Sequence, residues 1–97
     1  MAKKKTISGA RLLGRLKAVI GHSTNNSPSS IRVGDELDRY FQVPQGVIAF
    51  LITLDTSPEF RPDGLALQPD DVREATKVSD LHDAVKGWYR NNGWTVT

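Results

Sequence analysis

The segment Val47–Leu54 constrains the fold more than any other part of the chain, because its eight residues are almost all apolar. A run of this length fits a buried strand or the middle of a buried helix, and its periodicity does not distinguish the two. Its β-branched residues favour a strand locally. The chain has no second convincing strand, however, and a lone strand would leave its backbone hydrogen-bonding groups unpaired. We therefore expect a helix over residues 47–54, with an α+β fold that uses this segment as a strand as the alternative.

The length of the chain allows one small domain with a modest core. Its 97 residues are 38% hydrophobic and 25% charged, a composition typical of globular proteins. The chain has no cysteine, which excludes disulfides and cysteine-ligated metals. Its longest unbroken apolar run, Val47–Ile52, is far shorter than the roughly 20 residues of a membrane-spanning helix. The start of the chain also lacks the apolar stretch of a secretory signal. We expect a soluble, cytoplasmic domain.

The N-terminal part is predicted to contain an arm, a helix and a loop. Residues 1–7 show no apolar period, so we expect a flexible basic arm there and a single helical domain over residues 8–97. The first helix begins after the N-cap Ser8 and ends at Gly21, and the polar segment 22–30 forms a loop. One face of this helix carries the apolar residues Leu12, Leu13, Leu16, Val19 and Ile20.

The middle of the chain is punctuated by prolines. A weak helix is expected over Gly34–Phe41, because apolar residues recur there at helical spacing, and Pro44 ends it. Residues 55–67 include two prolines and a glycine and are predicted to form a second loop. Pro69 suits the first position of a short helix, whose positively polarised first turn would hold two aspartates.

The last helix has the clearest boundaries. Ser79 is the expected N-cap, the helix runs over residues 80–91, and Gly93 ends it. Its apolar face is formed by Leu81, Ala84, Val85 and Trp88. We therefore expect Trp88 to lie in the core. Together with the helices described above, this element completes a predicted all-α bundle of four helices.

Two segments carry a family resemblance. Residues 67–85, LQPDDVREATKVSDLHDAV, combine a proline-initiated acidic helix with the turn that opens the last helix. Residues 51–60 end in Glu59 and Phe60, as the second helix of the same family often does. Both segments resemble the acyl carrier proteins, which bear a phosphopantetheine arm in fatty-acid and polyketide synthesis. The resemblance covers about residues 9–90 and implies a bundle with helices in the order long, central, short and terminal.

The attachment site of that family is altered in this chain. In the family, the 4'-phosphopantetheine arm is esterified to a serine that opens the second helix. The family's spacing from Phe60 places this position at Gly46, which has no hydroxyl. Ser57 is the nearest substitute, although it is better explained as a helix N-cap. The central helix also lacks the acidic outer face by which carrier proteins usually meet their enzymes. We therefore expect no cofactor, and a phosphopantetheine carrier that uses Ser57 is an alternative.

No residues form a recognisable catalytic or metal-binding pattern. The chain has two histidines, His22 and His82. His82 is followed by Asp83, but adjacent residues on a helix do not face each other, so we expect a solvated histidine and no enzyme. The spacing of the two histidines does not match a metal site. Caps and solvated faces account for the acidic residues Asp35, Glu36, Asp38, Asp70 and Asp71.

Basic residues are concentrated at the start of the chain. The first 17 residues contain no acid and six cations, namely Lys3, Lys4, Lys5, Arg11, Arg15 and Lys17. This asymmetry suggests a nucleic-acid interface as an alternative function. The favoured interpretation is a solubilising segment, because no aromatic residue is interleaved with these cations.

Aromatic residues near the end of the last helix suggest a protein-binding surface. Tyr89 is rotated away from the expected core position of Trp88, and Trp94 lies beyond Gly93. Trp94 is expected to fold back over the small core. Tyr89, Trp94 and Arg90 nevertheless form the best candidate contact surface, because aromatic and arginine side chains dominate binding energy at interfaces. We therefore predict a non-catalytic protein-interaction module with a protein partner of unknown identity.

Overall fold

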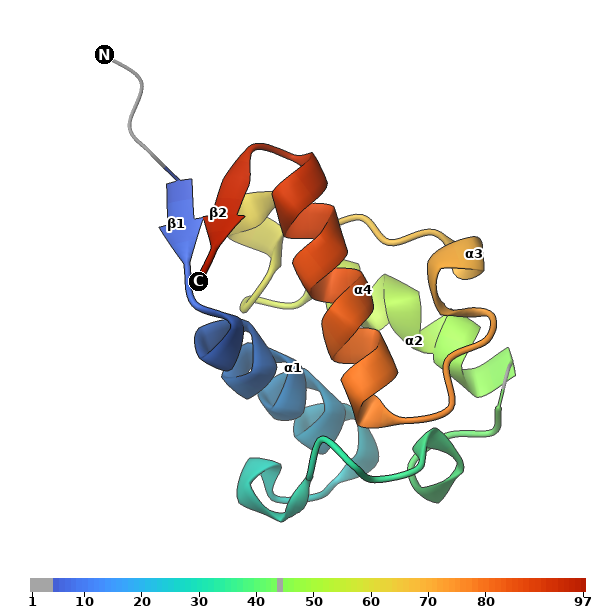
Figure 1. Cartoon of the computed structure of the whole chain (residues 1–97). Helices are drawn as coiled ribbons and strands as arrows, with labels where there is room; N and C mark the ends of the chain where they lie inside the picture. The colour runs from blue at the N-terminus through green and yellow to red at the C-terminus, as the bar shows by residue number, and fades with distance from the viewer. Residues whose placement is uncertain (1–4, 44) are drawn as a thin grey trace.

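The computed structural model describes residues 5–43 and 45–97. In this part of the chain, four helices and a two-stranded parallel sheet are arranged around one core. Their bounds are β1 Lys5–Ile7, α1 Gly9–Thr24, α2 Gln45–Thr56, α3 Pro69–Val72, α4 Val78–Asn91 and β2 Trp94–Val96. In Figure 1, α4 lies at the centre of the view, with α1 on one side and α2 and α3 on the other. The prediction of four helices is confirmed, whereas the parallel sheet shows that the fold is mainly helical and not all-α as predicted.

Helix α1 begins as predicted but ends one turn later. The Ser8 hydroxyl accepts a hydrogen bond of 3.0 Å from the Arg11 N–H, as an N-cap does. The helix continues past Gly21 to Thr24, and Asn25 caps it in the left-handed conformation with φ of 60°. The prediction that Gly21 ends the helix is therefore wrong. A Cβ on this buried glycine would lie 2.6 Å from the Asn26 carbonyl oxygen, so close packing of the following loop requires glycine.

Helix α2 confirms the helical prediction for residues 47–54. Its buried residues recur at i, i+3, i+4 and i+7, which is the spacing of one helical face, and they are Val47, Phe50, Leu51 and Leu54. This face packs toward α1 and α3. A strand over this segment, the alternative considered above, does not form.

The predicted helix over residues 34–41 is wrong. Only a 3-10 turn forms there, at Leu37–Arg39. The backbone of the segment is instead hydrogen-bonded to the first turn of α4, where the Val78 N–H donates to the Asp35 carbonyl at 3.0 Å. The Leu37 N–H also donates to the Thr76 carbonyl at 2.8 Å. These long-range bonds hold the segment in a conformation that its own apolar spacing does not favour.

The start of α4 also differs from the prediction. The N-cap position is Lys77, and Ser79 lies inside the helix, so the prediction of a Ser79 cap is wrong. The Asp80 carboxylate accepts from the N–H groups of Thr76 and Lys77 at 2.8 and 3.0 Å. These hydrogen bonds favour the charged carboxylate and lower the pKa of Asp80.

At the other end of α4, Gly93 has φ of 87° in the turn that leads into β2. At α3, the predicted start at Pro69 is confirmed.

The two ends of the described chain meet in the small sheet. Lys5 pairs with Trp94 and Ile7 with Val96 in parallel register, and Ile7 is buried. Figure 1 shows the two strands side by side near the start of α1. The prediction of a flexible arm is therefore wrong for residues 5–7, while residues 1–4 lie outside the described part of the chain. Among the described residues, no helix is long and apolar enough to cross a bilayer.

Candidate functional site

Tyr89 belongs to the core and not to a contact surface. Its exposed fraction is 0%, and it is the largest fully buried side chain. The Tyr89 hydroxyl donates a hydrogen bond of 2.7 Å to Asp63 Oδ2. Burial, together with this bond, raises the pKa of Tyr89. Trp88, which was predicted to lie in the core, is only partly buried. Tyr89 takes the core position instead. The expectation that Tyr89 lies outside the core is wrong.

Asp63 connects three parts of the fold. Its Oδ2 atom accepts from Tyr89 on α4 and from Arg15 Nη1 on α1, the latter at 3.0 Å. The exposed fractions of the Arg15 and Asp63 side chains are 26% and 19%. Charge-assisted hydrogen bonds of this kind are among the stronger ones in proteins. The cluster therefore fixes the loop before α3 against both long helices.

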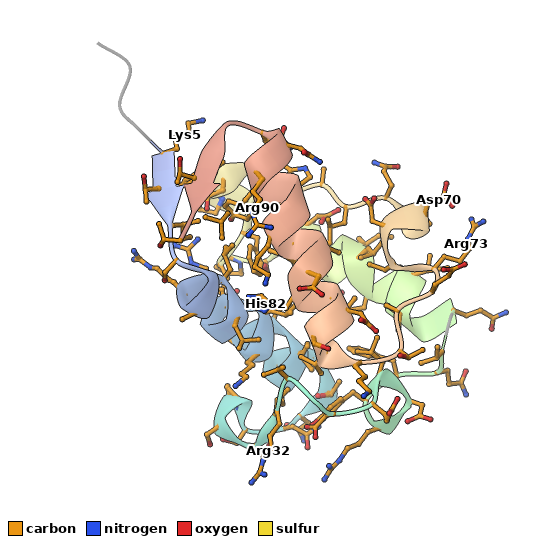
Figure 2. All side chains as sticks on the ribbon, in the orientation of Figure 1. Lys5, Arg32, Asp70, Arg73, His82 and Arg90 are labelled. Carbon is orange, nitrogen blue, oxygen red and sulfur yellow. The ribbon has the colours of Figure 1, made fainter. Side chains whose placement is uncertain are left out.

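Trp94 folds back over the core, as expected. Its partly buried ring meets the Tyr89 ring edge to face, with centroids 5.2 Å apart. Lys5 Nζ lies 5.7 Å from the centroid of the Trp94 ring, within reach of a cation–π interaction. Arg90 is exposed on α4 (Figure 2). Of the predicted contact surface, Arg90 and part of Trp94 are accessible, and their binding to a protein stays a prediction.

The basic residues of the first segment have different neighbours. Lys5 lies near Trp94, and Arg15 is paired with Asp63. Arg11 is exposed, while Lys17 is half-buried. Lys3 and Lys4 lie outside the described residues. Of these described cations, Arg15 is therefore engaged in an ion pair, and a nucleic-acid interface stays an alternative prediction.

His82 links α4 to the start of α1. Its Nε2 atom lies 2.8 Å from the Gly9 carbonyl oxygen, and Figure 2 shows the side chain between the two helices. A carbonyl oxygen only accepts, so Nε2 carries the proton of this hydrogen bond. Burial lowers the pKa of His82, and the neighbouring charges of Lys86 and Lys17 lower it further. The prediction of a solvated histidine is wrong, because the imidazole is half-buried and holds two helices together.

Neither candidate position for a phosphopantetheine arm offers a free hydroxyl. Gly46 lies in the first turn of α2, where the family would carry its serine. Ser57 follows the end of α2 and is not an N-cap, contrary to the prediction. It is 6% exposed, and its hydroxyl donates to the Leu54 carbonyl at 2.7 Å. An ester at Ser57 would break this bond and require the buried residue to move.

The acidic clusters, for which caps and solvated faces were predicted, accept local hydrogen bonds and also form ion pairs. Asp35 accepts from the Tyr40 hydroxyl and the Arg32 N–H, and these bonds lower its pKa. Asp70 pairs with Arg73 at 2.7 Å on the outside of α3 (Figure 2). Asp71 accepts from the Gln68 N–H at 2.8 Å. The described residues contain no group of three or more acids or histidines that could hold a metal ion.

The outward side of α2 was not predicted as a site. We define the α2 outer face as Gln45, Ile48, Ala49 and Ile52. Ile52 is 72% exposed, more than any other large hydrophobic residue among those described. The helix has more apolar residues than its buried face uses, and this excess was the available signal. It was missed because the whole segment was assigned to the interior.

No protein-family model, curated protein or solved structure matches this chain.

Proposed function

We propose that this chain is a carrier-protein-like domain that acts without catalysis and binds a partner protein through the α2 outer face. The observation that carries the proposal is the 72% exposure of Ile52 in the middle of a helix. Full burial of an isoleucine side chain is worth about 1.5–3 kcal/mol. A partner that covers Ile52 would recover this energy.

The absence of charge on this face supports the same function. The four residues of the α2 outer face are uncharged, and Ile48 and Ile52 are one turn apart. Asp55 is the only ionisable residue of α2, and it is half-buried, with its carboxylate 3.4 Å from the Leu67 N–H. A partner can therefore cover the centre of the face without desolvating a charge, which suits the apolar core of a protein interface.

The resemblance to carrier proteins fits a binding role better than an arm-bearing role. Carrier proteins are contacted by other proteins along the second helix, and α2 occupies that place in the helix order. Gly46 has no hydroxyl for the arm, and the Ser57 hydroxyl is buried and hydrogen-bonded. A domain that has this framework and no attachment residue can bind proteins without carrying an acyl group.

Capture of partner proteins from extracts of the source cells tests the proposal. The wild type is compared with Ile52→Lys and with Val33→Lys, a control at another exposed hydrophobic residue with 40% exposure. We expect a protein that is retained by the wild type and by Val33→Lys and lost with Ile52→Lys. Circular dichroism of both variants checks that they are folded. Retention of the same proteins by Ile52→Lys would contradict the proposal, as would a wild-type homodimer that this substitution disrupts.

A further inference from the structure

A groove of about 760 Å³ lies between the C-terminal ends of α1 and α2. Helix α1 contributes Ala18, Val19 and His22 to its lining, and α2 contributes Thr53 and Thr56. Glu59 lines it from the segment after α2. Its volume falls within the range of about 300–1,000 Å³ that is usual for small-molecule sites. The groove lies at the end of α2 and does not include the α2 outer face.

The groove has a consistently negative electrostatic character. Two helices end beside it, α1 at Thr24 and α2 at Thr56, and each helix end carries roughly half a negative charge. Glu59 adds a formal charge, and none of the described residues forms an ion pair with it. No lysine or arginine of the described chain lines the groove. Among the described residues, His22 is the one histidine in the lining.

The lining also provides an apolar surface for the body of a ligand. The Ala18 and Val19 side chains belong to α1, and Thr53 and Thr56 present methyl groups from α2. The Thr56 hydroxyl is already engaged, because it donates to the Ile52 carbonyl at 2.8 Å. Carbonyls near the two helix ends are also engaged: Gly21 accepts from the Asn26 N–H at 2.9 Å, and Leu54 accepts from the Ser57 hydroxyl at 2.7 Å. The side chains of Asn25 and Asn26 add groups to the lining that both donate and accept.

We infer that this groove binds a small organic amine with an apolar body. The ammonium group lies near the Glu59 carboxylate and donates to it. The apolar body packs against Ala18, Val19 and the threonine methyl groups. An ammonium group carries a positive charge and three donors, which matches a groove lined by the Glu59 carboxylate and by no lysine or arginine of the described chain. The inference goes beyond the proposed function, because it requires no partner protein.

Three aromatic probes of similar size and different charge test the inference. Benzylamine, benzyl alcohol and benzoate are titrated separately into ¹⁵N-labelled full-length protein, and amide chemical shifts are followed. We expect saturable shifts with benzylamine at the groove residues, weaker shifts with benzyl alcohol and none with benzoate. No saturable shift at the groove with benzylamine would overturn the inference, and so would equal binding of benzoate.

Two matched variants locate the charge that selects the amine. Glu59→Gln keeps the size of the side chain and removes its charge, so benzylamine binding should weaken by about fivefold. Glu74→Gln makes the same change at an exposed acid that does not line the groove, and it should leave binding unchanged. Unfolding curves of both variants verify that they are folded. Equal affinity of Glu59→Gln and the wild type for benzylamine would overturn the assigned role of the carboxylate.

Discussion

The hydroxyl of Tyr89 donates a 2.7 Å hydrogen bond to the Asp63 oxygen that also accepts from Arg15. This contact joins α4 to the loop before α3 and, through Arg15, to α1. It also explains why Tyr89, and not Trp88, occupies the core. The Tyr89 ring fills the space between Phe60 and Trp94, while its hydroxyl reaches an acceptor at the edge of the core.

Replacement of Tyr89 should be more destabilising than replacement of Trp88. Tyr89→Ala removes a fully buried ring and should lower the free energy of unfolding by about 3–5 kcal/mol, enough to unfold much of so small a domain. Trp88→Ala should cost less, because that ring is partly exposed. Urea denaturation of the two variants measures the difference. If Trp88→Ala were the less stable variant, the assignment of Tyr89 to the core would be wrong.

Loss of the Tyr89 hydroxyl alone should have a smaller effect. Tyr89→Phe retains the ring and removes the donor to Asp63, so the free energy of unfolding should fall by about 1–3 kcal/mol. The substitution leaves Asp63 with its contact to Arg15. Comparison of the urea midpoints of Tyr89→Phe and the wild type measures this contribution. Identical midpoints would show that the hydrogen bond adds nothing to stability.

Two glycines of α1 should respond to alanine with opposite signs. At Gly21, an added Cβ would lie 2.6 Å from the Asn26 carbonyl oxygen, so Gly21→Ala should destabilise the protein by about 1–3 kcal/mol. At Gly14, a Cβ meets no atom within 4 Å, so Gly14→Ala should stabilise the helix by about 0.5–1 kcal/mol. Thermal melts of both variants provide the comparison. Stabilisation by both substitutions would contradict the close approach of the loop to Gly21.

Acidification should weaken the contact between α4 and α1. The pKa of His82 is lower in the folded protein than the value of about 6.5 in an unfolded chain. As the pH falls through about 6.5, the unfolded chain binds the proton first, so the free energy of unfolding decreases. His82→Gln should lose less stability between about pH 7.5 and about pH 5.5. Urea unfolding at the two pH values tests this, and equal losses would exclude a contribution from His82.

Features that depend on neighbours within a helical turn could be predicted from the sequence. The Ser8 cap and the start of α3 at Pro69 are of this kind. A cap needs a side chain and an N–H group three residues away, and proline suits the first turn of a helix. Tertiary contacts changed neither of these local preferences. The helix over residues 47–54 was predicted on a different ground, the lack of a convincing partner strand.

The features that were missed depend on distant residues. Strand β1 contains only three residues with no clear pattern, and it forms because β2 at the other end of the described chain pairs with it. Tyr89 is buried because Phe60 and Asp63 lie beside it, and the position of their loop is not encoded in the period of α4. Exposure of Ile52 was missed for a similar reason, since an apolar run does not reveal which of its faces has a partner.

The affinity of the captured partner for the Ile52→Ala variant tests the central claim most directly. Calorimetric titration of the purified partner compares this variant with the wild type and with Arg90→Ala, which changes an exposed residue on α4. If the α2 outer face is the binding surface, Ile52→Ala should weaken binding by about tenfold or more, because about 1.4 kcal/mol of burial energy corresponds to that factor. Arg90→Ala should leave the affinity near that of the wild type. An unchanged affinity of Ile52→Ala, or a larger loss with Arg90→Ala, would contradict the claim.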